Sequence, residues 1–543
     1  MGNISPLEAF LCGVLYWIGV GNFPFIGLWT LQRPLICGTI TGVILGHPLE
    51  GVMIGASINL IYMGFMSAGG SMPADMSLAG ILGTVYAISG GLDVKTAIAI
   101  AVPIGLLGSI IWTTRMTVDS IFVHMADRYI EREEYHKIWR ANVCYPQIFC
   151  ACISILPCAI AAYFGAEYIT GCISLLDGKI LQILQTAGGL MPCLGIAITL
   201  RYIFEGEAKV FFFVGFFIVA YTNLPMHIIG VISLLVAILY VKCKGEEAFM
   251  EVDEDWEDEE EEEEEEPPHR GKLLSKSSLI KAWMIWEHFP QTCYNYERMM
   301  GQQMAHIFVS ISKKLYPNDR EKRKDLMKRE IQFFNTHVEF GACVTGMTIA
   351  LEEKKAMGEM IPDSLIQSLK TSFMGSVAGI GDTIWQGAVL PVILALCIDF
   401  TKSGNGNLLG PVLYAGVIFV LAYVISYHSF FFGYRMGGNG ILDLLEKGAI
   451  KKVIFGSSIM GCMMMGGIVV KYVACSCNIR LHLVSGAYSL QGQLFDKICP
   501  QILPLAVTML VYYLLKRRKW STTKVMLAIL FVSIIGSLTG ILV

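Results

Sequence analysis

The chain has 543 residues, of which 54% are hydrophobic and only 16% are charged. A soluble core of this size needs far less apolar surface, so the composition excludes an ordinary soluble protein and predicts an integral membrane protein. The formal net charge of −4 is unevenly distributed, because residues 251–266 hold 14 acidic side chains among 16 positions and the rest of the chain carries 41 basic against 31 acidic groups. A basic body suits anionic lipid headgroups and cytoplasmic loops.

Apolar stretches long enough to cross a membrane, or nearly so, recur along the whole chain. They cover about residues 7–29, 35–66, 78–112, 148–165, 190–242, 372–399, 408–433, 452–474, 501–515 and 525–543. Glycine or proline interrupts many of them, which favours discontinuous or re-entrant helices over plain spans. The expected fold class is an all-α, polytopic integral membrane protein.

The 16 cysteines are scattered and mostly lie within apolar runs, which favours buried thiols that pack as small hydrophobic groups. The one compact pair, Cys475 and Cys477, has neither a second pair nor histidines at zinc-finger spacing nearby. We therefore expect no metal and no cofactor, and nothing in the sequence indicates binding to nucleic acid. No removable signal peptide is expected, because no basic region with a cleavage site opens the chain.

In the first half, Arg33 is the first Lys or Arg of the chain, and no other follows before Lys95. A lone arginine between apolar segments serves either as a snorkelling anchor at the interface, which is the commoner case, or in a ligand pathway. Spacing alone does not decide between these roles. Further on, residues 115–147 carry charges on nearly every face of the expected helix, which indicates a solvated helix and loop.

The stretch Gly55–Asp75 places hydrogen-bonding side chains in apolar sequence. Asn59 and Tyr62 are three residues apart and share one face of the expected helix, and Ser67 follows them. Before Asp75 the helix is expected to break at residues that favour turns, namely Gly69, Gly70 and Pro73. The polar groups suit the hydroxyls of a sugar, but hydrogen bonds between helices, worth about 0.6 to 2 kcal/mol, explain them equally well.

An acidic low-complexity tract separates two apolar halves of similar size. It cannot bury enough apolar surface to offset its ordering entropy, so residues 246–270 are expected to form a disordered, extended linker. The expected domains are a membrane domain at residues 1–245 and a second domain at residues 271–543. Within the second, residues 271–336 are expected to form amphipathic helices on the cytoplasmic side, and residues 337–543 the membrane part.

This membrane part contains a run of small residues that ends in an acid. Gly375, Gly379 and Gly381 precede Asp382 in otherwise apolar sequence and predict a break in a membrane helix. An unpaired carboxylate in hydrocarbon costs about 3 kcal/mol, which favours a functional role for it. The alternative is a tight helix crossing in which Asp382 caps the next helix. The isolated histidines, His337 among them, are expected at core or interface positions.

These motifs together resemble the membrane components of the mannose family of the bacterial phosphoenolpyruvate-dependent sugar phosphotransferase system. Residues 7–242 resemble the IIC component through residues 33–35, the passage to residues 73–75, and residues 188–192. Residues 275–543 resemble the IID component through a series of spaced segments at residues 295–299, 314–317, 350–353 and 375–382, followed by Trp385 and Pro391. The chain is therefore similar to a fusion of IIC and IID.

The resemblance implies a permease that translocates a hexose or related sugar, of mannose, fructose, sorbose or amino-sugar type, while a separate cytoplasmic IIAB component phosphorylates it. It implies no catalysis by this chain alone. It also implies a place in the cell membrane, contact with membrane lipid, and a homotrimer with inverted repeats and an elevator-like movement. Two alternatives stay open: an ion-coupled secondary sugar transporter, and a non-transporting receptor or scaffold.

With this resemblance in view, Asp75 and Asp382 are the leading substrate-binding candidates, because each follows a glycine-rich stretch and inverted-repeat transporters bind substrate at helix breaks. Carboxylates and amides pair with sugar hydroxyls, whereas an aromatic ring covers the apolar face of a sugar. The further polar candidates are Asn59, Ser67, Gln32 and Arg33. The aromatic candidates are Trp29, Tyr62, Phe65 and Trp385.

The chain departs from the mannose-specific members at several positions. Asn59 and Ser67 stand where those members usually carry glutamate and asparagine. Ser376 stands where they have proline, and Leu390 stands where arginine is common. The expected fold does not depend on these changes, whereas the identity of the sugar does.

Overall fold

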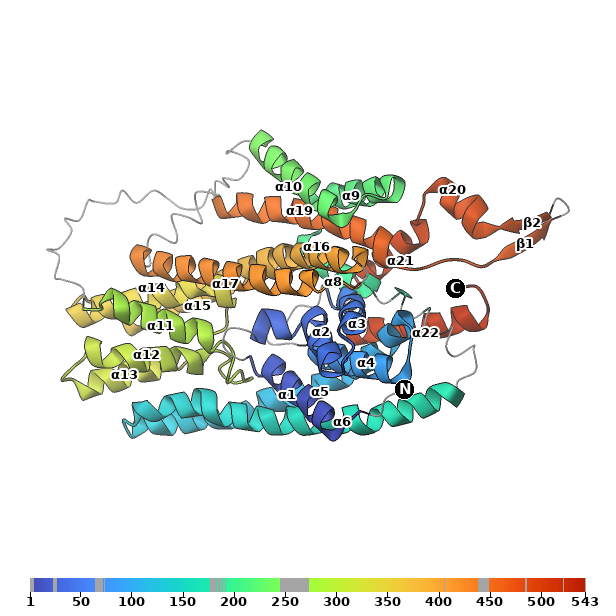
Figure 1. The fold of residues 1–543 in the computed structure, drawn as a ribbon. Coiled ribbons are helices and arrows are strands. Elements are labelled where there is room, and N and C mark those ends of the chain that lie inside the picture. The colour runs from blue at the N-terminus through green and yellow to red at the C-terminus, as the bar shows by residue number, and fades with distance from the viewer. Residues whose placement is uncertain are drawn as a thin grey trace.

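The computed structural model describes residues 4–22, 27–63, 72, 74–175, 183, 186, 189–190, 192–244, 273–404, 406–437, 449–483, 486–520 and 522–542. The molecule is elongated and almost entirely helical (Figure 1), which confirms the all-α membrane fold class. A short antiparallel hairpin of β1 (Arg480–Leu483) and β2 (Gly486–Ser489) is an addition that the sequence did not indicate. The predicted linker at residues 246–270 lies outside the described residues, as do Phe65, Ser67, Gly69, Gly70 and Pro73.

The first half is built from helices of very different length. They are α1 (Pro6–Val20), α2 (Pro34–Ile44), α3 (Pro48–Ile61), α4 (Met76–Gly90), α5 (Val94–Glu131), α6 (Tyr145–Leu175), α8 (Pro192–Ile203), α9 (Ala208–Thr222) and α10 (Met226–Cys243). Short segments η1 (Gly27–Leu31), η3 (Tyr135–Lys137) and η4 (Arg140–Cys144) join some of them. Several of these helices begin at a proline, whose fixed φ and missing N–H suit the first helical turn.

The second half begins with α11 (Lys276–His288), α12 (Gly301–Leu315) and α13 (Arg320–Glu330), which gather at one end of the molecule (Figure 1). The elements that follow are α14 (Val338–Met357), α15 (Asp363–Gly381), η6 (Asp382–Val389), α16 (Leu390–Ser403), α17 (Leu409–Met436), α19 (Ala449–Tyr472), η7 (Gln491–Phe495), α20 (Asp496–Ile498), α21 (Ile502–Lys516) and α22 (Thr522–Leu538).

Within the described ranges, five helices are long and apolar enough to cross a membrane. They are Val94–Glu131, Tyr135–Gly165, Asp363–Ser403, Leu409–Arg435 and Phe455–Tyr472. A sixth span is possible in the pair Gln491–Ile498 and Ile502–Lys516, which is bent by 67°. Other apolar helices, such as α1 to α4, have fewer than the roughly 17 residues that a span requires. Discontinuous helices of this kind are what the glycine and proline interruptions predict.

Helix α5 joins the two halves. Its 38 residues correspond to about 57 Å, well beyond a hydrocarbon core of about 30 Å. Near its end, the guanidinium of Arg298 binds Asp127 through two hydrogen bonds of 2.7 and 2.8 Å. Glu131 pairs with Lys324 and Lys328 of α13 at 2.8 and 2.6 Å. The overhanging part of α5 is therefore fixed to the helices that open the second half.

The prediction that residues 115–147 are solvated throughout is wrong, because α5 buries two of the charged side chains in this range. Arg115 and Asp119 are both buried, with a guanidinium-to-carboxylate distance of 3.5 Å. Arg115 also donates to the carbonyl of Val20 in the first half and to those of Gln291 and Thr292 in the second. Arg115 is therefore a buried link between the two halves. A sequence pattern with charges on all faces of a helix does not reveal such a contact.

The predicted helix break at Gly375, Gly379 and Gly381 is wrong. The backbone continues from α15 into the π-helical segment η6 and then α16, and Asp382 itself is helical with φ −61° and ψ −41°. Asp382 therefore does not cap a new helix either. A Cβ at Gly381 would lie 2.4 Å from Cγ of His337, whereas none at Gly375 or Gly379 would meet another atom within 4 Å. Gly381 therefore allows close packing against His337, as in the alternative prediction of a tight helix crossing, and does not form a turn.

Candidate functional site between the two halves

Trp29 of η1 is the point at which the two halves bring polar and aromatic groups together. Its indole N–H donates to the carboxylate of Glu339 in α14. Its ring stacks on that of His337, with centroids 5.9 Å apart and planes at 14°, and meets the ring of Trp385 edge-on at 6.3 Å. The hydroxyl of Tyr414 donates to the carbonyl of Trp29 at 2.9 Å. Four side chains of the second half therefore surround one residue of the first.

Several polar atoms in this cluster are buried without a hydrogen-bond partner among the described residues. They are the indole nitrogen of Trp385, both ring nitrogens of His337 and one carboxylate oxygen of Glu339. His337 Nδ1 lies 3.2 Å from that oxygen, but without the geometry of a hydrogen bond. Leaving a buried polar group unpaired costs about 1 to 3 kcal/mol. A concentration of such groups at one place makes it a candidate site for a polar ligand.

Three acids belong to the cluster, one each from α11, α14 and η6. Glu287 and Asp382 lie close enough to Glu339 to act on it electrostatically. Asp382 is partly buried and accepts a 2.6 Å hydrogen bond from the amide of Gln386. One carboxylate oxygen of Glu287 is buried without a hydrogen-bond partner among the described residues. In the described part of the chain, no lysine or arginine forms an ion pair with any of the three acids.

Three of the predicted polar residues of the first half, Gln32, Arg33 and Asn59, lie near η1 and the start of α2. The guanidinium of Arg33 is buried and donates to the carbonyl of Tyr62 at 3.4 Å. It also interacts with the hydroxyl of Tyr414, which links it to the carbonyl of Trp29. The side-chain oxygen of Asn59 accepts from the N–H of Leu35 at 3.1 Å, and its amide nitrogen has no partner in the residues described.

Gln32 lies in the same group of residues. Its side-chain amide donates to the side-chain oxygen of Asn22 at 2.8 Å. The amide nitrogen of Asn22 is buried and unpartnered within the described ranges. Gln32, Arg33 and Asn59 thus lie on the first-half side of the junction at which Trp29 meets the second half.

Asp75 is held elsewhere within the first half. Its carboxylate accepts from the hydroxyl of Tyr16 at 2.6 Å and, as the N-cap of α4, from the N–H of Leu78 at 2.9 Å. Its own N–H donates to the carbonyl of Gly105 at 2.7 Å. Both carboxylate oxygens therefore have protein partners, and the structure does not bring Asp75 together with Asp382.

The sequence did not point to Glu339, Glu287 or Tyr414 as site residues, and it placed His337 only at a core or interface position. The available signal was the run His337-Val-Glu339, which sets an acid two residues after a histidine at the start of an apolar helix. Trp29 and Glu339 are 310 positions apart in the chain, so no local pattern shows that they meet.

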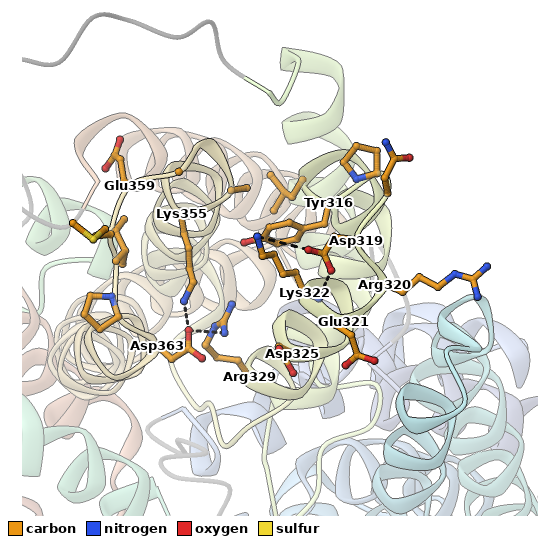
Figure 2. Close-up of a pocket in the computed structure, with 18 residues that line it drawn as sticks. Tyr316, Asp319, Arg320, Glu321, Lys322, Asp325, Arg329, Lys355, Glu359 and Asp363 are labelled. Atoms are coloured by element: carbon orange, nitrogen blue, oxygen red, sulfur yellow. Dashed lines mark hydrogen bonds and ion pairs between the residues drawn. The ribbon is translucent and has the colours of Figure 1, made fainter.

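An open groove at the end of the second half contrasts with this site (Figure 2). Its volume is about 1130 Å³, and two turns line it, at residues 315–322 and 355–363, together with side chains of α13. Asp363 pairs with Lys355 and, at 2.8 Å, with Arg329, while Lys322 lies 3.6 Å from Asp319. Behind it, Arg329 binds Glu352 through hydrogen bonds of 2.6 and 2.8 Å. The charged side chains named here are therefore paired with one another within the protein.

Comparison with known proteins gives the two halves separate matches. Residues 6–239 match the family profile described as the sorbose-specific IIC component of the phosphotransferase system, and residues 273–542 match its mannose/fructose/sorbose family IID component. The mannose-specific EIID component of Escherichia coli K12 is 32% identical over 279 residues, which are 50% of this chain and 96% of that protein. The sorbose-specific EIIC component of Lacticaseibacillus casei is 31% identical over 242 residues, which are 44% of this chain and 86% of that protein.

Among solved structures, a cryo-EM structure of the mannose transporter ManYZ in complex with microcin E492 is similar at 30% identity. The match covers 50% of this chain and 99% of that one, with a TM-score of 0.30.

The fold and the sequence matches thus define a membrane component of a sugar transport system. The chain belongs to the mannose/fructose/sorbose family of the phosphotransferase system and joins the IIC and IID components in one polypeptide. This confirms the resemblance drawn from the sequence motifs. The protein is therefore a sugar permease of the inner membrane, and its family implies a sugar substrate and a cytoplasmic IIAB partner.

Proposed function

We propose that this chain carries a hexose or related sugar inward while a separate IIAB component phosphorylates it, and that the sugar binds where Trp29 meets the second half. The observation that carries this proposal is the cluster of buried, unpartnered polar atoms beside two indole rings. Sugars need such a combination, because their hydroxyls require hydrogen-bonding groups and their apolar faces pack on aromatic rings.

Within this site, Trp29 and Trp385 are assigned to the apolar face of the sugar. Glu339 and Asp382 accept from its hydroxyls, and His337 donates to or accepts from them. From the first half, Arg33, Asn59 and Gln32 complete the polar lining. Asp75 is assigned a supporting role, because capping α4 and bonding to Tyr16 already occupy its carboxylate. Ser67 stays a candidate on sequence grounds alone.

The proposal also covers the absence of catalysis by this chain, its two linked domains and its assembly. The chain supplies no catalytic group, and the phosphoryl group comes from IIAB. The two domains, at residues 1–245 and 271–543, are joined by the acidic linker, and the family profiles leave the interval 240–272 unmatched. A linker keeps the halves at a high effective concentration, on the order of millimolar for a short flexible chain. The assembly is a homotrimer in contact with membrane lipid.

Uptake into vesicles tests this function. The full chain is placed in vesicles loaded with phosphoenolpyruvate and the cytoplasmic phosphotransferase components, IIAB included, and accumulation of sugar phosphate is measured. We expect accumulation that requires IIAB and that Trp29→Ala abolishes. Trp520→Ala is the matched control, because that indole is 41% exposed and belongs to no part of the site.

Two results would contradict the proposal. Uptake driven by an ion gradient alone, without phosphoenolpyruvate and IIAB, would identify a secondary transporter. Sugar binding without any uptake under either condition would identify a receptor or scaffold.

A further inference from the structure

Helix α17 of the second half carries a tyrosine that reaches the first half. The hydroxyl of Tyr423, in the same helix, bonds to the ring of His288 at 2.9 Å and so stays within the second half. The hydroxyl of Tyr414 instead crosses to η1 and donates to the carbonyl of Trp29 at 2.9 Å. The side chain of Tyr414 is fully buried. This residue therefore joins α17 to the part of the first half that carries the proposed sugar contacts.

The Tyr414 hydroxyl serves two groups of the first half. A tyrosine hydroxyl has one hydrogen to donate and an oxygen that also accepts. Its hydrogen goes to the carbonyl of Trp29, and the hydroxyl also interacts with the guanidinium of Arg33. Arg33 is 2% exposed, and a buried guanidinium requires acceptors for its N–H groups. One hydroxyl thus serves a backbone acceptor and a buried cation at the same time.

The orientation of Trp29 depends on such contacts. Trp29 lies in η1, which has five residues. A helical segment of this length is marginal by itself, so neighbouring elements must fix its orientation. The carbonyl of Trp29 accepts from Tyr414 in α17, and its indole N–H donates to Glu339 in α14. Two helices of the second half therefore hold the backbone and the side chain of one residue of the first half.

Resting on the function proposed above, we propose that Tyr414 is a positioning residue of the sugar site. Its hydroxyl fixes Trp29 and Arg33 in the orientation in which they meet the sugar, and it acts through these two residues without contacting the sugar. Binding groups must be held within about 0.5 Å of their productive positions, so the loss of such a support weakens binding. Phenylalanine at position 414 keeps the buried ring but removes both interactions of the hydroxyl.

Uptake kinetics of Tyr414→Phe test this role. The full chain is assayed in vesicles with phosphoenolpyruvate and IIAB, with whichever of mannose, fructose and sorbose the natural chain takes up best. The sugar concentration is varied so that KM and the maximal rate are obtained separately. We expect Tyr414→Phe to raise KM about tenfold at an unchanged maximal rate, because the loss of a hydrogen bond to a charged group is of this order.

Tyr86→Phe is the matched control. The buried Tyr86 of α4 donates its hydroxyl to the carbonyl of Ala161 in α6 at 2.8 Å, so this bond lies within the first half. Both variants lose a bond from a buried tyrosine to a carbonyl, and their unfolding temperatures should fall to a similar extent. KM should rise for Tyr414→Phe and stay unchanged for Tyr86→Phe. The same rise of KM in both variants would show a general structural effect and overturn the positioning role.

The link to Arg33 is tested by combining variants. Arg33→Gln already lacks the guanidinium, so adding Tyr414→Phe should raise KM by a smaller factor than Tyr414→Phe does alone. Fully additive effects would overturn the assignment of Arg33 as a group that Tyr414 positions.

The outcomes also separate this role from the function on which it rests. Normal uptake with an unchanged KM in Tyr414→Phe would overturn the positioning role and leave the permease function in place. Absence of IIAB-dependent uptake by the natural chain would overturn the function and, with it, the role of Tyr414.

Discussion

Two clusters of buried charge in the second half differ in one respect. Around Arg329 near the groove, acids and bases alternate: Arg329 binds Glu352, and Lys370 binds Glu330 at 2.9 Å. Around Glu339 at the inter-half contact, the described residues place one basic group, the ring of His337, within ion-pair distance of the acid. A buried ion pair completed by the chain fixes a structure, whereas a buried acid without a cation is a candidate for contact with a ligand. We therefore assign the acids near Arg329 to structure and propose that those around Glu339 bind the sugar.

The largest expected effect is at the paired cluster. Arg329→Met removes the partner of Glu352 and leaves a buried charge uncompensated, so we expect a loss of about 3 to 5 kcal/mol of stability. Thermal unfolding of the purified protein measures it. The double variant Arg329→Met with Glu352→Leu removes both charges and should regain most of the loss. A single variant as stable as the natural protein would show that this pair does not hold the fold.

A smaller effect is expected at the edge of the unpaired cluster. Gly381→Ala sets a methyl group against the ring of His337, so that ring must move, at about 1 to 3 kcal/mol. Sugar uptake should fall together with the unfolding temperature. Gly375→Ala and Gly379→Ala are the matched controls, since no atom lies within 4 Å of either new Cβ and alanine favours a helix by about 0.5 to 1 kcal/mol. Equal behaviour of all three variants would argue against the close approach at Gly381.

In contrast to Arg329→Met, a substitution within the unpaired cluster should not lower the stability of the protein. Glu339→Gln removes the acid on which Glu287 and Asp382 act unfavourably, while keeping its shape and its acceptor for Trp29. We expect unchanged or slightly higher thermal stability together with weaker sugar uptake. A loss of stability comparable with that of Arg329→Met would show that Glu339 is a structural acid, and the contrast between the clusters would fail.

The smallest effect is expected outside both clusters. Shortening the acidic tract at residues 251–266 while keeping its reach should leave uptake unchanged, because its proposed role is to tether the halves. Uptake and membrane assembly are measured side by side. Normal assembly with lost uptake would show that the tract recruits or regulates a partner.

Sequence patterns predicted the class of the fold well and the site only in part. Composition and spaced motifs led to the fused IIC and IID components, because apolar length and short local motifs are properties of neighbouring residues. Arg33, Asn59 and Trp385 were predicted and do lie at or beside the inter-half junction. The contact of Trp29 with Glu339 depends on helix packing across 310 positions, which no period in the chain encodes.

The glycines also show that local sequence does not determine which elements pack together. A glycine permits both a turn and a close helix contact, and only the neighbouring helix decides between them. For Gly381 that neighbour is His337, which enters from a different element. Asp75 likewise follows an expected helix break, yet its carboxylate already accepts a hydrogen bond from the hydroxyl of Tyr16 in α1.

The overhang of α5 has a mechanical consequence. The carbonyl of Gly105, which holds the backbone of Asp75, and the carboxylate of Glu131, which holds α13, belong to one helix and are separated by about 39 Å along its axis. A force on α13 is therefore transmitted to the start of α4 through one continuous helix. Relative displacement of these two points requires α5 to bend or an ion pair to open, and no proline favours a bend between them, because Pro103 precedes Gly105.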